Sequence, residues 1–191
     1  MPFIDNQLGQ IQKGQLLQLA RRSIEHGVLK GAPVTVVDKE FHNELLRPGA
    51  AFVTLHKQKN LRGCVGTLNA HQPLIRDVAD NAFAAAFRDT RFPQVSGDEL
   101  SEIHIEISVL TPREPITFSC QSELLEAIEP HIDGIVIEDG YYRSTFLPSV
   151  WEQLPDRKEF LQHLKLKAGM GKDYWSESIK AFRYRTISFG E

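Results

Sequence analysis

The sequence is short of the features that mark several classes of protein. It holds only two cysteines, Cys64 and Cys120, and neither has a partner at the spacing of a zinc knuckle. One pair of cysteines is no disulfide framework, so a reducing cytosol is the expected location. No apolar run approaches the roughly 20 residues of a membrane-spanning helix. The start, Met1–Asp5, lacks the basic and apolar regions of a secretory leader.

Neither sign of charge dominates the chain. The 22 lysines and arginines and the 25 acidic residues leave a formal net charge of −3. Proteins that bind nucleic acid usually have a basic balance, so nucleic acid is not the expected partner. The C-terminal third does contain a basic group that could contact RNA, but a solvated surface explains it better. The group consists of Lys165, Lys167, Lys172 and the run Arg183-Tyr184-Arg185.

Internal repeats, low-complexity tracts and a Pro/Ser-rich linker are also missing, so residues 1–191 are expected to form a single domain. Hydrophobic residues make up 41% of the chain, which is typical of a globular protein with a substantial core. The strands are arranged as hairpins without a repeating βαβ pattern, which predicts an α+β fold with a mainly antiparallel sheet and helices packed on it. Periodicity predicts helices over residues 10–26, 73–87, 122–128 and 156–169, and strands over 50–56, 62–68, 103–110, 135–137, 141–147 and 179–189.

Three local signals set the expected ends and turns of these elements. Gly27 is placed to end the first helix. The pair Asp139-Gly140 favours a type I′ hairpin turn, because both residues tolerate positive φ angles. Asp156 and Glu159 have the spacing of a capping box at the start of the last helix.

The segment Leu61–Leu68, with the sequence LRGCVGTL, is the part of the chain most indicative of chemistry. If it is a regular strand, Arg62, Cys64 and Gly66 point to one face. A guanidinium beside a thiol stabilises the thiolate, which is the reactive nucleophile. Gly66 would leave room for a ligand to approach.

A structural interpretation of the same segment is open from the residues alone. Free cysteines are usually small, buried and inert side chains. In that interpretation Gly63 and Gly66 mark a β-bulge, and Cys64 belongs to the core.

Three further residues are candidates for a site. His104 and Glu106 are two apart in the strand 103–110, opposite its isoleucines. They could serve as base and acid, as two metal ligands, or simply be solvated. Arg91 could hold an anionic group with its planar guanidinium, or tie down its own loop. The histidines form no His-Glu-x-x-His arrangement and the glycines no phosphate-binding fingerprint, so no metal site is predicted and the sequence identifies no cofactor.

The segment Leu61–Leu68 closely resembles the signature of the AMMECR family, also called AmmeMemoRadiSam system protein A in bacteria. The resemblance extends over nearly the whole chain in the family's order. Gln94 stands where the family usually has a second proline, and Ser144 where glycine is expected. The matching segments are Arg91-Phe92-Pro93, Ile105–Pro112, Gly134–Ile137, Phe146-Leu147-Pro148 with Val150, Phe160-Leu161 and Lys167-Ala168-Gly169.

The resemblance implies an antiparallel sheet with flanking helices and a smaller lobe, and a functional cleft near the Arg-Gly-Cys segment. It also implies association with a radical SAM protein and a MEMO-like protein, but no accepted activity. Two hypotheses follow. In the first, the protein is an enzyme or an enzyme component that acts on a small molecule or on a partner's product. Its catalytic residues would be Cys64, Arg62 and Glu106, and its substrate-binding residues Arg91, Gly66 and His104. In the second, it is a non-catalytic binding or scaffold module.

Overall fold

The computed structural model describes residues 8–191, so the expectation about a leader at Met1–Asp5 lies outside the described residues. The chain divides into two compact units, a larger one of residues 1–111 with 187–191 and a smaller one of residues 112–186. The predicted fold class is confirmed, because helices pack on antiparallel sheets and a smaller lobe is present. That residues 1–191 behave as one domain stays a prediction.

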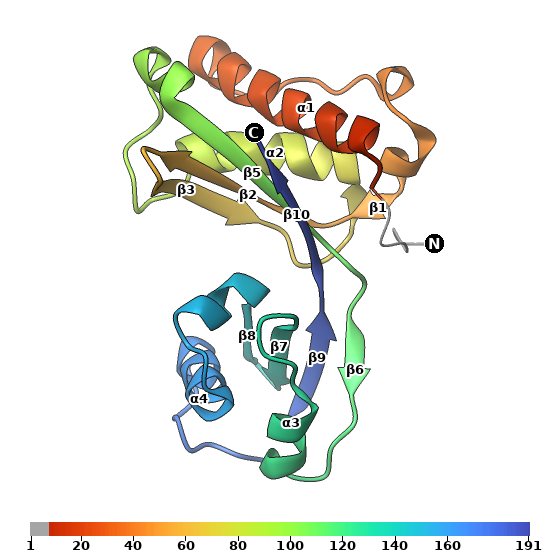
Figure 1. Ribbon diagram of the computed structural model, residues 1–191, viewed down its shortest axis with the longest axis vertical. Helices are drawn as coiled ribbons and strands as arrows, with labels where there is room; N and C mark the ends of the chain where they lie inside the picture. The colour runs from red at the N-terminus through yellow and green to blue at the C-terminus, as the bar shows by residue number, and fades with distance from the viewer. Residues whose placement is uncertain (1–7) are drawn as a thin grey trace. The chain divides into compact units, whose positions relative to one another are not determined.

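The larger unit has two helices on one face of a four-stranded sheet (Figure 1). The strand order is β10-β5-β2-β3, so β2 is central and β3 is an edge. Alternate residues of β2 and β5 are fully buried against the helices, and the residues between them are not. The elements of this unit are α1 (Gln10–Lys30), η1 (Asp38–Glu40), η2 (Asn43–Leu46), β1 (Pro48–Gly49), β2 (Ala51–Lys57), β3 (Asn60–Gly66), β4 (Gln72–Pro73), α2 (Leu74–Phe87), η3 (Gly97–Glu102), β5 (Ile103–Leu110) and β10 (Thr186–Gly190).

The smaller unit has its own sheet, in the order β6-β9-β7-β8, and its own core. Leu124 from one helix and Phe160, Leu161 and Leu164 from another pack on strand residues such as Ile135. Trp151 is fully buried and stacks on Phe160 at 3.6 Å between ring centroids. The elements are β6 (Glu114–Ile116), α3 (Gln121–Ala127), β7 (Gly134–Asp139), β8 (Tyr142–Phe146), η4 (Pro148–Glu152), α4 (Arg157–Lys167) and β9 (Lys180–Tyr184).

The first helix runs past its predicted end. Gly27 lies inside α1, where a Cβ would come within 2.3 Å of the Phe87 ring, so this glycine permits close helix packing. The helix ends at Gly31 instead, which has a φ of 68° and is the left-handed cap. Gly27 therefore marks a close contact between α1 and Phe87 and not the end of the helix.

The turn of the β7–β8 hairpin differs from prediction. In the β7–β8 turn only Gly140 has positive φ, and the residue that follows it, Tyr141, does not, so the predicted type I′ turn at Asp139-Gly140 is wrong. Two consecutive positive φ angles occur in the β2–β3 turn, at Gln58 and Lys59. The sheet imposes that turn on residues with no preference for it.

The start of the last helix agrees with prediction in part, and the extent of the last strand does not. Asp156 caps α4 through its carboxylate, which accepts from the backbone N–H groups of Lys158 and Glu159, and this is the Asp156 half of the predicted capping box. The single strand predicted over 179–189 is wrong, because the structure has two strands there, β9 and β10, in different sheets. Among the helices of residues 8–191, none has both the length and the apolarity to span a membrane. A cytoplasmic location stays a prediction.

Candidate functional site

The residues of interest gather on the face of the first sheet that is turned away from α1 and α2, here called the polar face. On β2, Val53 and Leu55 are fully buried towards the helices, so Thr54 between them lies on the other side. In register, Thr54 is opposite Cys64 on β3 and opposite Glu106 on β5. The polar face comprises Phe52, Thr54, His56, Leu61, Cys64, Gly66, His104, Glu106 and Ser108.

A β-bulge separates Arg62 from Cys64. Leu55 pairs with Gly63, but the next residue, His56, pairs with Leu61, so Arg62 is the extra residue of the bulge. Because the bulge shifts the alternation, Arg62 does not share the polar face with Cys64. The prediction that the two side chains lie side by side is therefore wrong.

Arg62 instead holds the loop that follows α2. Its guanidinium donates to both carboxylate oxygens of Glu99, at 3.1 and 2.9 Å, and to the carbonyls of Pro93 and Gln94, at 2.8 and 3.4 Å. These bonds lower the pKa of Glu99 to about 2, with the Arg62 hydrogen bond as the largest cause. Arg62 is 9% exposed. Its position and bonds are those of a structural residue.

Cys64 is half-buried and is surrounded by donors and a carboxylate. The Thr54 hydroxyl donates to the sulfur at 3.4 Å. The Cys64 N–H donates to Asp89 at 2.9 Å, and its carbonyl accepts from Arg91 at 3.3 Å. Because β3 is an edge strand, Asp89 and Arg91 satisfy the backbone groups that a further strand would otherwise pair. The structural interpretation of Cys64 as a sealed core residue is not what the structure shows.

Asp89 and Arg91 form one ionic unit. Arg91 donates to the two carboxylate oxygens of Asp89 at 2.9 and 2.7 Å. This contact lowers the pKa of Asp89 well below its usual range. It also raises the pKa of Arg91, to which a charge interaction with Cys64 contributes as well. The guanidinium beside Cys64 is thus that of Arg91, not that of Arg62.

The two glycines of the segment are packed against neighbours. A Cβ on Gly66 would lie 2.2 Å from the Phe52 side chain, so the ring of Phe52 occupies the position predicted to be open for a ligand. A Cβ on Gly63 would lie 2.2 Å from the carbonyl oxygen of Ala85 in α2. Substrate binding at Gly66 has no support from this geometry.

His104 and Glu106 lie where the sequence placed them, exposed on the polar face. A second histidine, His56, is directly opposite His104, and its Nε2 is 3.7 Å from Glu106 Oε2. Among residues 8–191, no three His, Cys, Asp or Glu side chains are arranged to hold a metal ion. Imidazole and carboxylate side chains are of the types that serve as general acids and bases.

Sequence reasoning missed Thr54, His56 and Asp89. The first two were invisible because their role depends on cross-strand register, which a single strand pattern does not give. Asp89 is two residues before Arg91, and this spacing of opposite charges in a loop was the available signal.

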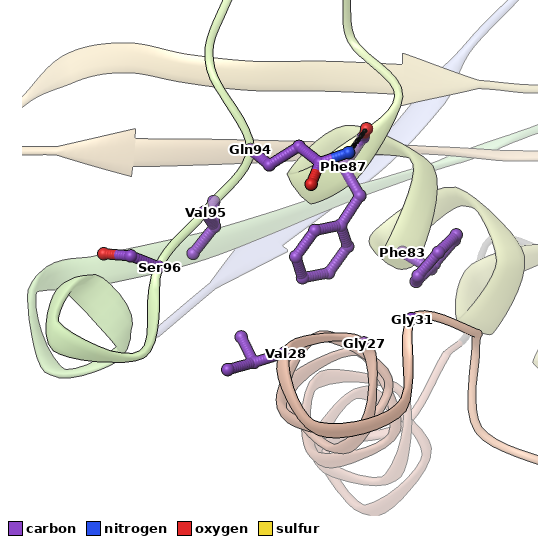
Figure 2. Close-up of a pocket in the computed structure, with 8 residues that line it drawn as sticks. All are labelled: Gly27, Val28, Gly31, Phe83, Phe87, Gln94, Val95 and Ser96. Atoms are coloured by element: carbon purple, nitrogen blue, oxygen red, sulfur yellow. Dashed lines mark hydrogen bonds between the residues drawn. The ribbon is translucent and has the colours of Figure 1, made fainter.

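A cavity of about 380 Å³ lies elsewhere in the same unit, between the ends of α1 and α2 (Figure 2). Phe83, Phe87 and Val95 make much of its wall apolar. Gln94 donates to the carbonyl of Phe87 at 3.4 Å. None of the polar-face residues lines this cavity.

The basic group considered for RNA binding is largely committed to internal bonds. Lys165 is fully buried and donates to Gln121 at 2.6 Å. Tyr184 is 1% exposed. Lys167 donates to the Thr145 carbonyl at 2.9 Å. Lys172 and Arg185 are exposed, so nucleic-acid binding through this group stays a less favoured hypothesis.

Known proteins match this chain over most of its length. The family model described as AMMECR1 matches residues 17–189. The protein MJ0810 of Methanocaldococcus jannaschii is 36% identical over 95% of this chain and 91% of its own. A protein of Thermotoga maritima is 37% identical over 86% of this chain and 91% of its own. The crystal structure of the uncharacterized protein PH0010 from Pyrococcus horikoshii is similar with a TM-score of 0.85, at 33% identity, over 93% of this chain and 90% of that one. The chain belongs to the AMMECR1 family.

Proposed function

We propose that the polar face around Cys64 is a catalytic site, and that Cys64 is its nucleophile towards a small molecule or a partner's product. One observation carries the proposal. The Cys64 thiol is half-buried, not sealed; it accepts from the Thr54 hydroxyl, and the Arg91 guanidinium donates to the Cys64 carbonyl. A hydroxyl donor and a cation are the kinds of neighbour found around reactive cysteines.

The proposed step is a nucleophilic displacement. The Cys64 thiolate forms a bond from sulfur to an electrophilic acyl carbon of the substrate, and the leaving group departs with the electrons of the bond that breaks. The leaving group takes a proton from the Glu106–His56 pair. Water then attacks the resulting thioester, which breaks the sulfur–carbon bond, releases a carboxylic acid and restores the Cys64 thiol. Glu106 is two strands from Cys64, about 10 Å at the usual strand spacing. The substrate therefore spans the cross-strand row of Cys64, Thr54 and Glu106 and is not held by one residue.

The backbone around the thiol is fixed, which favours a defined attack geometry. Asp89 holds the Cys64 N–H, and Arg91 holds both Asp89 and the Cys64 carbonyl. Arg62, which the sequence placed in catalysis, supports the site indirectly through the loop that includes Pro93.

The electrophile that we propose is a product of a partner enzyme. The AMMECR resemblance associates such chains with a radical SAM protein and a MEMO-like protein. Radical chemistry forms new bonds at carbon, and a following displacement by a thiolate is a compatible second step.

Alkylation of Cys64 measured against pH tests the proposal. Cys120 is exposed, so a Cys120→Ser background leaves Cys64 as the only thiol. We expect a half-maximal rate at a pH clearly below the free-thiol value of about 8.5. Arg91→Gln should move this point up by about 0.5 to 1 pH unit, since the guanidinium is partly exposed.

The matched control is Arg76→Gln. Arg76 is an arginine of similar exposure, paired with Asp38 and remote from the polar face, so its loss should leave the profile unchanged. Failure of Cys64 to label in the folded protein, or a profile centred on the free-thiol value, would remove the basis for a catalytic thiolate.

A binding or scaffold function is the second candidate. The observation that favours it is the apolar surface beside Cys64, where Leu61 is 42% exposed and the Phe52 ring covers Gly66. In this case Cys64→Ser should leave cellular function intact, whereas Leu61→Asp should abolish it. The opposite pattern would support catalysis.

A further inference from the structure

Thr54 is a residue of the polar face that bonds the sulfur directly, and it was not among the candidates found in the sequence. Its hydroxyl donates to Cys64 Sγ at 3.4 Å. It is opposite Cys64 in the β2–β3 register and opposite Glu106 in the β2–β5 register. We infer that Thr54 is a positioning residue that holds and stabilises the Cys64 thiolate, an inference that rests on the proposed function.

The strand arrangement fixes where the hydroxyl points. β2 is a central strand, paired on both sides, so the Thr54 backbone is held by two ladders. A β-branched side chain in a strand has few χ1 rotamers. Val53 and Leu55, the neighbours along the strand, are fully buried on the opposite face, which prevents a register slip. The donor is therefore placed before the thiolate forms.

The chemistry follows from the two states of sulfur. A thiol is only a weak acceptor, whereas a thiolate is an anion for which a hydroxyl donor is a stronger partner. The Thr54 bond thus favours the charged form over the neutral one. Arg91 bonds the Cys64 carbonyl from the edge of β3, and its charge interacts with Cys64. Thr54 is the second stabilising group and acts from the interior of the sheet.

Thr54 also separates the nucleophile from the acid–base pair. The cross-strand row runs from Cys64 through Thr54 to Glu106, and His56 lies 3.7 Å from Glu106. A substrate bonded to sulfur passes over the threonine on its way to Glu106. The short side chain of Thr54 leaves that path clear.

Two substitutions in the Cys120→Ser background test the inference. Thr54→Val keeps the shape and removes the hydroxyl, and Thr54→Ser keeps the hydroxyl and loses a methyl. The valine variant should shift the half-maximal alkylation of Cys64 up by about 1 pH unit, the low end for a hydrogen bond to a charged group. The serine variant should return to within a few tenths of a unit of the parent. Unfolding midpoints measure whether both variants are folded.

The outcomes separate this inference from the proposed function. If the parent profile is centred below the free-thiol value and the valine variant has the same profile, Thr54 does not stabilise the thiolate, and only the inference fails. A serine variant that behaves like valine would overturn it equally. If the parent itself titrates as a free thiol, the proposed function fails and the inference falls with it.

Discussion

Replacing Arg62 by glutamine and replacing Arg91 by glutamine should affect different properties of the protein. Arg62 is close to Cys64 in sequence and Arg91 is close to it in the folded protein, so the two arginines have different tasks. The side chain of Arg62 is 11% exposed and pairs with Glu99, whereas that of Arg91 is 56% exposed and pairs with Asp89. We expect Arg62→Gln to act on stability, and Arg91→Gln to act on the reactivity of Cys64.

The magnitude for Arg62 comes from its four hydrogen bonds. Breaking a buried ion pair by removing one partner costs about 3 to 5 kcal/mol. Loss of donors to the Pro93 and Gln94 carbonyls adds to this cost. Glu99 keeps its contact with Lys57 and remains partly exposed to solvent, and both reduce the cost of removing Arg62. We therefore expect Arg62→Gln to lower the free energy of unfolding by about 3 kcal/mol, and Arg91→Gln by about 1 kcal/mol or less.

The assay must report on the larger unit. Both tryptophans and all four tyrosines lie within residues 112–186, so intrinsic fluorescence reports on the smaller unit alone. Far-ultraviolet circular dichroism is dominated by α1 and α2, the two longest helices, and it should be followed during urea unfolding. The reasoning is refuted if Arg62→Gln costs no more than Arg91→Gln. It is also refuted if Arg62→Gln, but not Arg91→Gln, moves the alkylation profile of Cys64.

Two further predictions concern packing and pH. Gly63→Ala should destabilise the larger unit by about 3 kcal/mol, because its Cβ would meet a backbone oxygen of α2 at 2.2 Å. Gly14→Ala, inside α1 with nothing within 4 Å of its Cβ, should stabilise it by about 0.5 to 1 kcal/mol, and circular dichroism measures both. Burial raises the pKa of Tyr184 from 10.0 to about 12, so the neutral phenol is favoured in the folded state and stability should fall as pH rises from about 10 towards 12. The free energy of unfolding, measured by tryptophan fluorescence, should fall by about 3 kcal/mol over this range, and it should not fall in Tyr184→Phe. An equal fall in that variant would mean that other groups cause it.

Periodicity and turn chemistry were sufficient to predict the fold class and most elements. The β2–β3 hairpin, α2 and β5 lie where alternation or helical spacing placed them. The exceptions are positions where a tertiary contact overrides a local preference. Gly27 continues a helix because it packs on Phe87, and the chain after β9 crosses to another sheet although its composition is uniform.

The candidate site was only partly predictable, for one physical reason. Strand alternation predicts which side chains share a face only if the strand is regular, and one bulge at Arg62 reverses that assignment. The cation beside Cys64 then comes from another segment, at Arg91, and the hydroxyl beside it from a neighbouring strand, at Thr54. Such relations depend on register and loop geometry, which no single segment encodes.

The most direct test of a reactive Cys64 is the rate at which a small alkylating agent labels it at neutral pH, in the folded protein and in the urea-unfolded chain. Peptide mass spectrometry separates it from Cys120, which is exposed and checks the reagent in both states. We predict that folded Cys64 reacts faster than unfolded Cys64, because Thr54 and Arg91 stabilise its thiolate only in the folded protein. Slower labelling of Cys64 in the folded protein than in the unfolded chain would contradict the account.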